Sequence, residues 1–174
     1  ATLDNLTMGL GTSTSVPYGL IGIGYVNNEA SLQTTKETYP NLPVALQQAG
    51  LIKTVAYSLW LNDLSSSSGS ILFGGIDTEK YVGDLATLPV LLNKRADNYT
   101  EFAVSLYSVE ASSSSGSDTL TSSQLPVRVV LDSGTSLTYL PQDMATQVWA
   151  EVGAVWDSTV NAAVLPCSFA NHDG

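Results

Sequence analysis

Hydrophobic and polar residues alternate along three segments of the chain, at 2–10, 55–61 and 102–109. Because successive side chains of a strand point to opposite faces, alternation with a period of two predicts half-buried β-strands there. A fourth segment, 129–131, is continuously apolar and contains two valines, which predicts a strand buried on both faces. Strands outnumber helices in this prediction, so the expected fold class is mainly β with short helices.

Two segments have the spacing of helices. The first begins around Asn41, with Pro43 at an early position, and ends at Gly50. The second opens at Pro141 and closes at Gly153, and Asp143 lies in its first turn. Its apolar face, at a spacing of four, consists of Met144, Val148 and Val152.

Two serine-rich stretches, 65–70 and 111–123, interrupt this pattern. Small polar side chains bury little surface, so ordering these stretches would cost more conformational entropy than packing returns. We expect both to be mobile surface loops, the second as an insertion before the apolar strand at 129–131.

The carboxylate of Asp132 is the strongest candidate for chemistry. It follows the apolar strand and enters a Ser133-Gly134-Thr135 turn. At the end of a buried strand, a carboxylate must be hydrogen-bonded or have a shifted pKa. The residues alone equally allow a β-turn in which Asp132 is only a cap. An Asp132 solvated on an outer rim, far from any cleft or neighbouring subunit, would overturn a catalytic role.

Three motifs resemble the pepsin-like, bilobal aspartic endopeptidases. The sequence VLDSGTS at 130–136, followed by Leu-Pro at 140–141, resembles their second catalytic loop. The sequence GLIGIG at 19–24 resembles the segment that threads under the first catalytic loop. SILFGGID at 70–77 with YVGDL at 81–85 resembles the crossing between lobes. The likeness covers most of the chain and is greatest to secreted fungal members, including the yapsin-like, cell-surface branch.

The resemblance implies part of a bilobal, pepsin-like acid protease β-barrel fold. Residues 1–76 would be the C-terminal part of the N-terminal lobe, and 77–174 the interlobe crossing with the N-terminal part of the C-terminal lobe. The sequence has no second Asp-Thr-Gly or Asp-Ser-Gly, so the first catalytic loop and the flap would precede residue 1. We therefore expect a middle fragment that is inactive and unstable by itself.

The resemblance also implies roles for single residues. Asp132 would be one of two catalytic carboxylates that share a proton and activate a water for peptide hydrolysis at acidic pH. Ser133 would hydrogen-bond across the lobe junction, and the hydroxyl of Thr135 would lie nearest the outer oxygen of Asp132. The implied substrate contacts are Gly134, Thr135, Ser136, Tyr139 and Val130, and Gly134 would also support the catalytic loop. The implied partners are peptide or protein substrates, the remaining segments of the enzyme and pepstatin-type inhibitors, with no cofactor.

Composition narrows the environment. The formal net charge of −10 at pH 7 disfavours nucleic acid and anionic membranes as partners, and suits a protein that works in acid. No apolar run approaches the roughly 20 residues that cross a bilayer. With the resemblance, these features predict a secreted or cell-surface protein in an acidic extracellular or vacuolar environment.

Three residues bear on covalent modification. Asn5 and Asn98 each begin an N-glycosylation acceptor triplet, which is compatible with secretion. Cys167 is the single cysteine, so it is either a free thiol or paired outside the chain, and the resemblance favours a disulfide. A catalytic pair of Cys167 and His172 is disfavoured, because residues five apart rarely reach hydrogen-bond distance. The residues also predict no metal site.

Three other kinds of protein remain open from the sequence. One is a catalytically inactive, aspartic-protease-like binding or inhibitor protein. Another is a homodimer that takes its second aspartate from the partner copy, although the motifs of another lobe argue against it. The third is a serine-rich surface or adhesion module, in which Asp132 is a turn residue.

Overall fold

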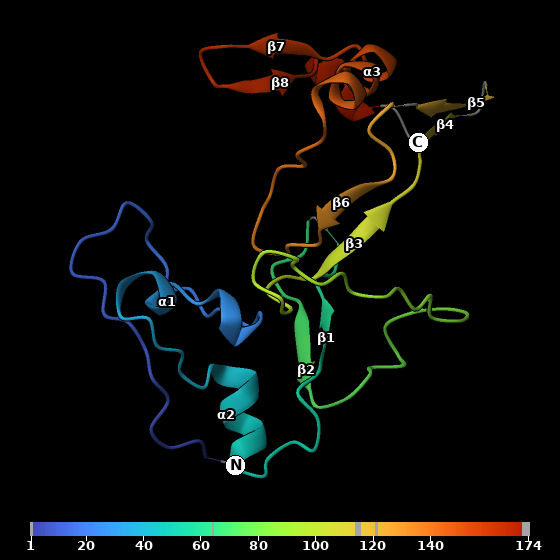
Figure 1. The fold of residues 1–174 in the computed structure, drawn as a ribbon. Coiled ribbons are helices and arrows are strands. Elements are labelled where there is room, and N and C mark those ends of the chain that lie inside the picture. The colour runs from blue at the N-terminus through green and yellow to red at the C-terminus, as the bar shows by residue number, and fades with distance from the viewer. Residues whose placement is uncertain (1, 64, 114–115, 121, 172–174) are drawn as a thin grey trace. The chain divides into compact units, whose positions relative to one another are not determined.

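The computed structural model describes residues 2–63, 65–113, 116–120 and 122–171 (Figure 1). The chain divides into two compact units, residues 1–101 and 102–174. Within the described residues, the strands form four separate two-stranded antiparallel sheets. The mainly β character with short helices agrees with the sequence pattern. The predicted lobe boundary at 76/77 stays a prediction beside this division at 101/102.

The first unit combines short helices with one hairpin. Its elements are a 3-10 helix at Val26–Asn28, α1 at Ser31–Thr34, α2 at Leu42–Gln48, β1 at Tyr57–Trp60 and β2 at Ser70–Phe73. β1 pairs with β2 so that Tyr57 is opposite Phe73, and these two rings meet edge to face. The strand predicted at 55–61 is thus confirmed, with slightly narrower bounds.

Helix α2 confirms the first predicted helix. Asn41 precedes it with extended backbone, Pro43 lies in its first turn, and Gly50 follows it with a left-handed φ of 70°. The buried Asn41 side chain also donates a hydrogen bond of 2.8 Å to the Gly24 carbonyl. This bond ties the start of α2 to the GLIGIG segment at 19–24.

The strand predicted at 2–10 is wrong. These residues, all described, form no helix or strand, and Leu10 is 90% exposed. Alternation supplies one apolar face, but a strand also needs a neighbour for its backbone hydrogen bonds. None of the described segments pairs with residues 2–10, so this segment has no partner strand to accept or donate backbone hydrogen bonds.

The second unit carries the strand that leads to Asp132. β3, Ala103–Leu106, pairs with β6, Val127–Val130, and Ala103 lies opposite Val130. β3 confirms the centre of the strand predicted at 102–109. β6 confirms a strand before Asp132, displaced toward the N-terminus of the predicted 129–131.

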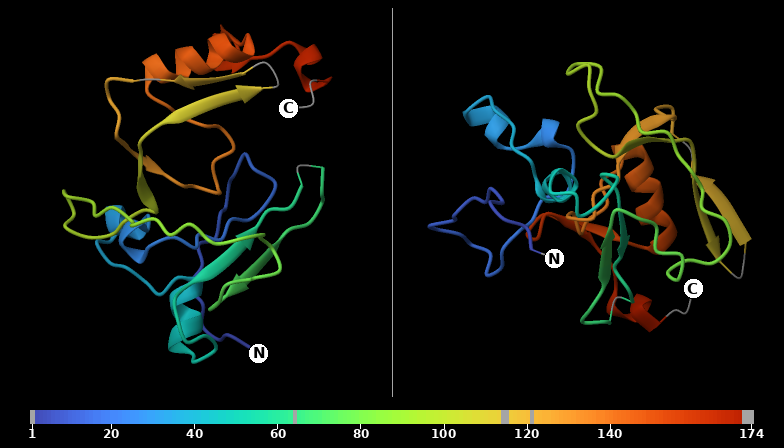
Figure 2. Two further views of the ribbon diagram at one scale, coloured as in Figure 1. Left: turned by 90° about the vertical axis from the view of Figure 1, so that its right-hand side faces the viewer. Right: turned by 90° about the horizontal axis from the view of Figure 1, so that it is seen from below.

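The serine-rich stretch at 111–123 is not a plain loop, which corrects the prediction. β4, Val109–Ser113, and β5, Gly116–Leu120, form a hairpin. Backbone hydrogen bonds hold such a ribbon without large side chains, so low hydrophobicity did not exclude it. Leu120, the last residue of β5, is buried, and β5 packs on α3 (Figure 2).

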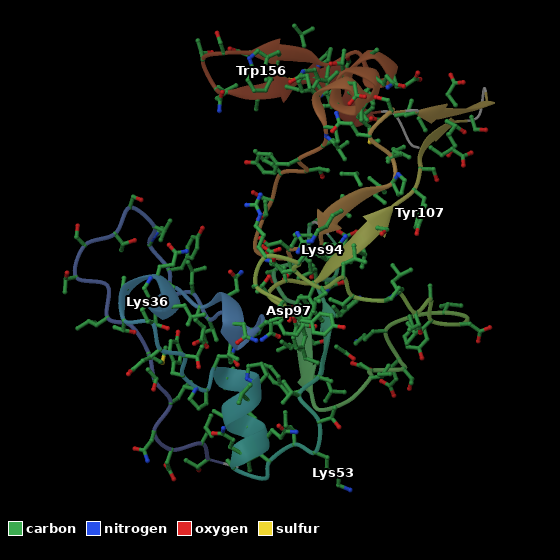
Figure 3. All side chains as sticks on the ribbon, in the orientation of Figure 1. Lys36, Lys53, Lys94, Asp97, Tyr107 and Trp156 are labelled. Carbon is green, nitrogen blue, oxygen red and sulfur yellow. The ribbon has the colours of Figure 1, made fainter. Side chains whose placement is uncertain are left out.

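The C-terminal part of this unit follows the second predicted helix. α3, Gln142–Val152, ends at Gly153, whose φ of 66° is left-handed. It is followed by β7 at Val155–Asp157, β8 at Ala162–Val164 and a 3-10 helix at Cys167–Asn171. Trp149 stacks on Trp156 of β7 at 5.7 Å between ring centroids, and Figure 3 labels Trp156 on this hairpin. Of the predicted inner face of α3, Met144 is fully buried, whereas Val148 and Val152 are half-buried.

The buried Met144 side chain generates the first prediction. We expect Met144→Ala, measured in the whole protein by urea unfolding, to lower the free energy of unfolding by about 2–5 kcal/mol through a cavity. Met8→Ala is the matched control, because Met8 is 66% exposed and its truncation should change stability by less than about 0.5 kcal/mol. Equal effects of the two substitutions would contradict this packing.

Candidate active site

The β3–β6 ladder determines where Asp132 leaves the sheet. Pairing of the strands ends at Ala103 and Val130, and the Leu131 amide then donates a hydrogen bond of 2.9 Å to the Phe102 carbonyl. Asp132 is the next residue. The chain therefore turns away immediately after its last contact with the neighbouring strand.

The turn holds both oxygens of the Asp132 carboxylate. The Gly134 amide donates to Oδ1 at 2.9 Å, and the Thr135 hydroxyl donates to Oδ2 at 2.5 Å. The Thr135 amide donates to the Asp132 carbonyl at 3.2 Å and closes the turn. The carboxylate plane is thus oriented by two donors on adjacent residues.

Two other aspartates show what is particular to Asp132. In the loop at Asp63, the amide and hydroxyl of Ser65 both donate to one oxygen, Oδ1. At Asp157, the amide and hydroxyl of Thr159 likewise both donate to Oδ1. These are ordinary Asx turns. Asp132 differs from both, because two donors of its own turn engage its two oxygens separately. Asp143 also accepts on both oxygens, but its Oδ2 donor is the hydroxyl of Ser122, 21 residues away in the sequence.

Hydrogen bonding lowers the pKa of Asp132. The Thr135 hydroxyl is the largest cause and the Gly134 amide the second, because both stabilise the charged carboxylate. The pKa values of Asp63 and Asp157 are lowered for the same kind of reason. A lowered pKa therefore does not by itself distinguish a catalytic aspartate in this chain.

The prediction that Asp132 follows a strand buried on both faces is wrong. The carboxylate is exposed, and Leu131 before it is 59% exposed. Among the described strands, β6 pairs only with β3, and such a ribbon does not cover both faces. The exposure meets part of the condition set above against a catalytic role. That role must therefore rest on the turn geometry and on family membership.

Gly134 lies close to the carboxylate of Asp132. A Cβ built on it would lie 3.2 Å from Asp132 Oδ1, closer than ordinary van der Waals contact. A side chain here would push on the oxygen that the Gly134 amide binds. Glycine thus lets the backbone approach the carboxylate closely enough to donate its hydrogen bond.

The remaining predicted site residues lie along the same segment, at and after the end of β6. Val130, Ser133, Ser136 and Tyr139 are all exposed, Tyr139 by 78%. In the described part of the chain, the Ser133 hydroxyl makes no hydrogen bond. The sequence analysis missed the exposed Leu131 and Leu137 beside them. In the sequence they could have been found as the apolar residues on each side of the polar turn at 132–136.

The predicted modification sites are exposed. Asn5 and Asn98 both face solvent, and Cys167 is a free, exposed thiol in this chain. His172 lies outside the described residues. The described residues hold no cluster of three potential metal ligands. None of their helices is both long and apolar enough to cross a membrane.

Comparison with known proteins decides the family. The family model described as "Eukaryotic aspartyl protease" matches residues 2–173. The chain belongs to the eukaryotic aspartyl protease family. The predicted pepsin-like relationship is thus confirmed, and the Asp-Ser-Gly-Thr turn of this aspartyl protease chain lies within the matched region.

The similar proteins come from fungi. Over 174 residues, the chain is 45% identical to the "Probable aspartic-type endopeptidase opsB" of Aspergillus fumigatus, covering 99% of the chain and 36% of that protein. It is 40% identical over 161 residues to "Secreted aspartic protease 8" of Candida albicans, covering 92% and 35% respectively. The chain therefore spans about a third of the length of these curated relatives.

A solved structure confirms the fold class. The aspartic proteinase from Irpex lacteus matches 92% of the chain and 46% of its own length, with a TM-score of 0.69 and 22% sequence identity. At this identity the likeness concerns the fold alone. The described strands thus belong to a pepsin-like fold, as the motifs predicted.

The two donors to Asp132 lead to a prediction on its ionisation. We expect Thr135→Val to raise the pKa of Asp132 toward its ordinary range, and Thr135→Ser to keep it low, as measured by NMR titration of the carboxyl carbon. Because the pKa in the folded state is lowered, ionisation stabilises the turn above the ordinary pKa. That contribution is lost as the pH falls through the lowered value.

The matched control is the turn at Asp157. Thr159→Val removes the corresponding hydroxyl and should raise the pKa of Asp157 while leaving Asp132 unchanged. An Asp132 pKa that does not respond to Thr135→Val would show that this hydroxyl does not bind the carboxylate.

Proposed function

We propose that the whole protein is an aspartic endopeptidase and that Asp132 is one of its two catalytic carboxylates. The observation that carries the proposal is that two donors of one short turn engage the two oxygens separately, the Gly134 amide at Oδ1 and the Thr135 hydroxyl at Oδ2. It occurs in an Asp-Ser-Gly-Thr turn of a chain that belongs to the aspartyl protease family. Asp63 and Asp157 share the lowered pKa but not this arrangement.

The chemistry follows from two facing carboxylates, a behaviour known for aspartic proteases as a class. Held close together, they cannot both ionise, so they share one proton. The charged member removes a proton from a water while the protonated member donates to the scissile carbonyl oxygen. Collapse of the resulting tetrahedral intermediate releases an amine and a carboxylic acid. The bonds from Thr135 and Gly134 help to keep a negative charge available in acid.

The neighbours of Asp132 receive the roles that the motif implies. The Ser133 hydroxyl would bind the opposite catalytic loop, which is supported by its having no hydrogen bond in the described part of the chain. Gly134, Thr135 and Ser136 would contact the substrate backbone. Val130 and Tyr139 would line the side-chain pockets, and pepstatin-type inhibitors would bind at the same place. No observation favours the alternative of an inactive binding protein.

The environment is proposed from the relatives and the charge. The name of the Candida albicans relative records secretion, and the charge of −10 suits work in acid. We therefore propose an extracellular or cell-surface protein, with the vacuole as the alternative location.

The exposed Cys167 would form a disulfide with a cysteine outside residues 1–174, which peptide mapping of the unreduced whole protein would reveal.

Replacing Asp132 tests the activity. With an acid-denatured protein as substrate, Asp132→Asn in the whole protein should lower kcat by at least about 10³-fold, because the pair loses its ionisable member. Asp157→Asn is the matched control and should retain activity, since Asp157 occupies an ordinary Asx turn. The isolated 174-residue chain should be inactive. Full activity of Asp132→Asn, or no proteolysis by the whole protein at any pH, would refute the proposal.

Glycosylation gives a separate prediction. The exposed side chains of Asn5 and Asn98 should carry N-glycans in protein secreted from a fungal host. Treatment with an N-glycosidase should then lower the mass of peptides that contain each residue and convert the asparagine to aspartate. Unmodified peptides before treatment would show that the two triplets are unused.

A further inference from the structure

The paired basic residues Lys94 and Arg95 have no part in the proposed active site. The chain contains only six lysines and arginines, against 16 aspartates and glutamates, and this is its one pair of adjacent basic residues. Acidic specificity pockets of proteinases bind basic side chains, so most of the chain offers such proteinases no recognition site. These two residues concentrate a third of its positive side chains at one point.

The pair lies at the tip of an exposed turn. Residues 94–97 form the turn and all are exposed, and Asp97 has a left-handed φ of 48° (Lys94 and Asp97 are labelled in Figure 3). In the described part of the chain, neither the Lys94 nor the Arg95 side chain makes a hydrogen bond or ion pair. Both charges are thus available to a partner.

Asn93 holds this turn closed. Its amide donates to the Asn98 carbonyl at 2.9 Å, in an isolated antiparallel bridge between the two residues. Its side-chain Oδ1 accepts from the Arg95 amide at 3.1 Å, and its Nδ2 donates to the hydroxyl of the buried Thr100 at 3.1 Å. The Asn93 side chain therefore links the backbone of Arg95 to the buried Thr100.

The segments on either side of the turn lack regular backbone pairing. Residues 84–92 before it and 99–102 after it belong to no helix or strand, although all are described. Opening of residues 94–97 would break the bonds of Asn93 and, if it reached Tyr99, the stacking of that ring on Tyr25 at 6.3 Å between centroids. Exposed tips of this kind are preferred sites of proteolytic nicking. The turn also lies close to the division between the two compact units, at 101/102.

We propose that the Lys94-Arg95 turn is a processing site for an endoproteinase that recognises paired basic residues, and that Asn93 controls its opening. Such a proteinase binds its substrate in an extended form, so the turn must open first. Hydrolysis breaks the peptide bond between Arg95 and Ala96. Water supplies the hydroxyl of the new Arg95 carboxyl group and a proton to the new Ala96 amine. This proposal does not depend on the aspartic endopeptidase activity.

The test uses the folded whole protein in the Asp132→Asn background, so that self-cleavage cannot contribute. A glycan at Asn98 would shield the bond, so one arm is first treated with an N-glycosidase. The protein is then incubated with a subtilisin-like endoproteinase specific for paired basic residues. Mass spectrometry follows the peptide that begins at Ala96. We expect this peptide to appear with the folded protein, and not with Arg95→Gln.

Variants of Asn93 test the control of opening. Asn93→Ala removes the side-chain bonds to Arg95 and Thr100, and should speed cleavage about tenfold if they contribute about 1.4 kcal/mol to closure. Asn93→Asp keeps the oxygen acceptor and should stay closer to the parent rate. Asn62→Ala is the matched control, because Asn62 makes similar loop bonds to Ser66 and Ser68 and should not change cleavage at Arg95.

Two results would overturn the proposal. The first is cleavage after Arg95 in urea-unfolded protein but none in the folded parent, with or without the glycan. The second is an equal acceleration by Asn93→Ala and Asn62→Ala, which would assign cleavage to general unfolding. The first result needs only the parent protein, so it remains decisive even if Asn93→Ala does not fold.

Discussion

The end of the β3–β6 ladder is the constraint on which the candidate site depends. Backbone pairing stops at Val130, one further amide bond holds Leu131 to Phe102, and the chain then turns. The turn is closed by bonds to Asp132 itself, from the Gly134 amide and the Thr135 hydroxyl. The side chain proposed for catalysis is therefore also the acceptor that shapes its own loop.

Side chains that accept backbone amides recur in the loops of this protein. Asp63, Asn93 and Asp157 each bind the amide two residues ahead. Such bonds satisfy backbone groups where no strand or helix does so. The same local device thus serves a structural turn, a closed basic turn and the proposed catalytic loop. Asp132 differs from these three residues because donors bind both of its side-chain oxygens instead of one.

Local signals in the sequence predicted much of the structure. Pro43, Gly50 and Gly153 mark helix ends through backbone angles that each residue carries with it, and α2 and α3 follow them. The Asp-Ser-Gly-Thr spacing likewise placed both donors within reach of Asp132. In these cases the interacting groups are a few residues apart, so the chain needs no distant partner to bring them together.

What the sequence by itself determined was the type of element and the chemistry of the Asp132 turn, together with the family that its motifs indicate. The tertiary structure decided pairing and exposure. It left residues 2–10 unpaired, folded the serine-rich stretch into the β4–β5 hairpin, and left Asp132 exposed. The physical reason is that a strand and a buried carboxylate both depend on distant neighbours. Alternation and composition describe one segment at a time and do not specify those neighbours.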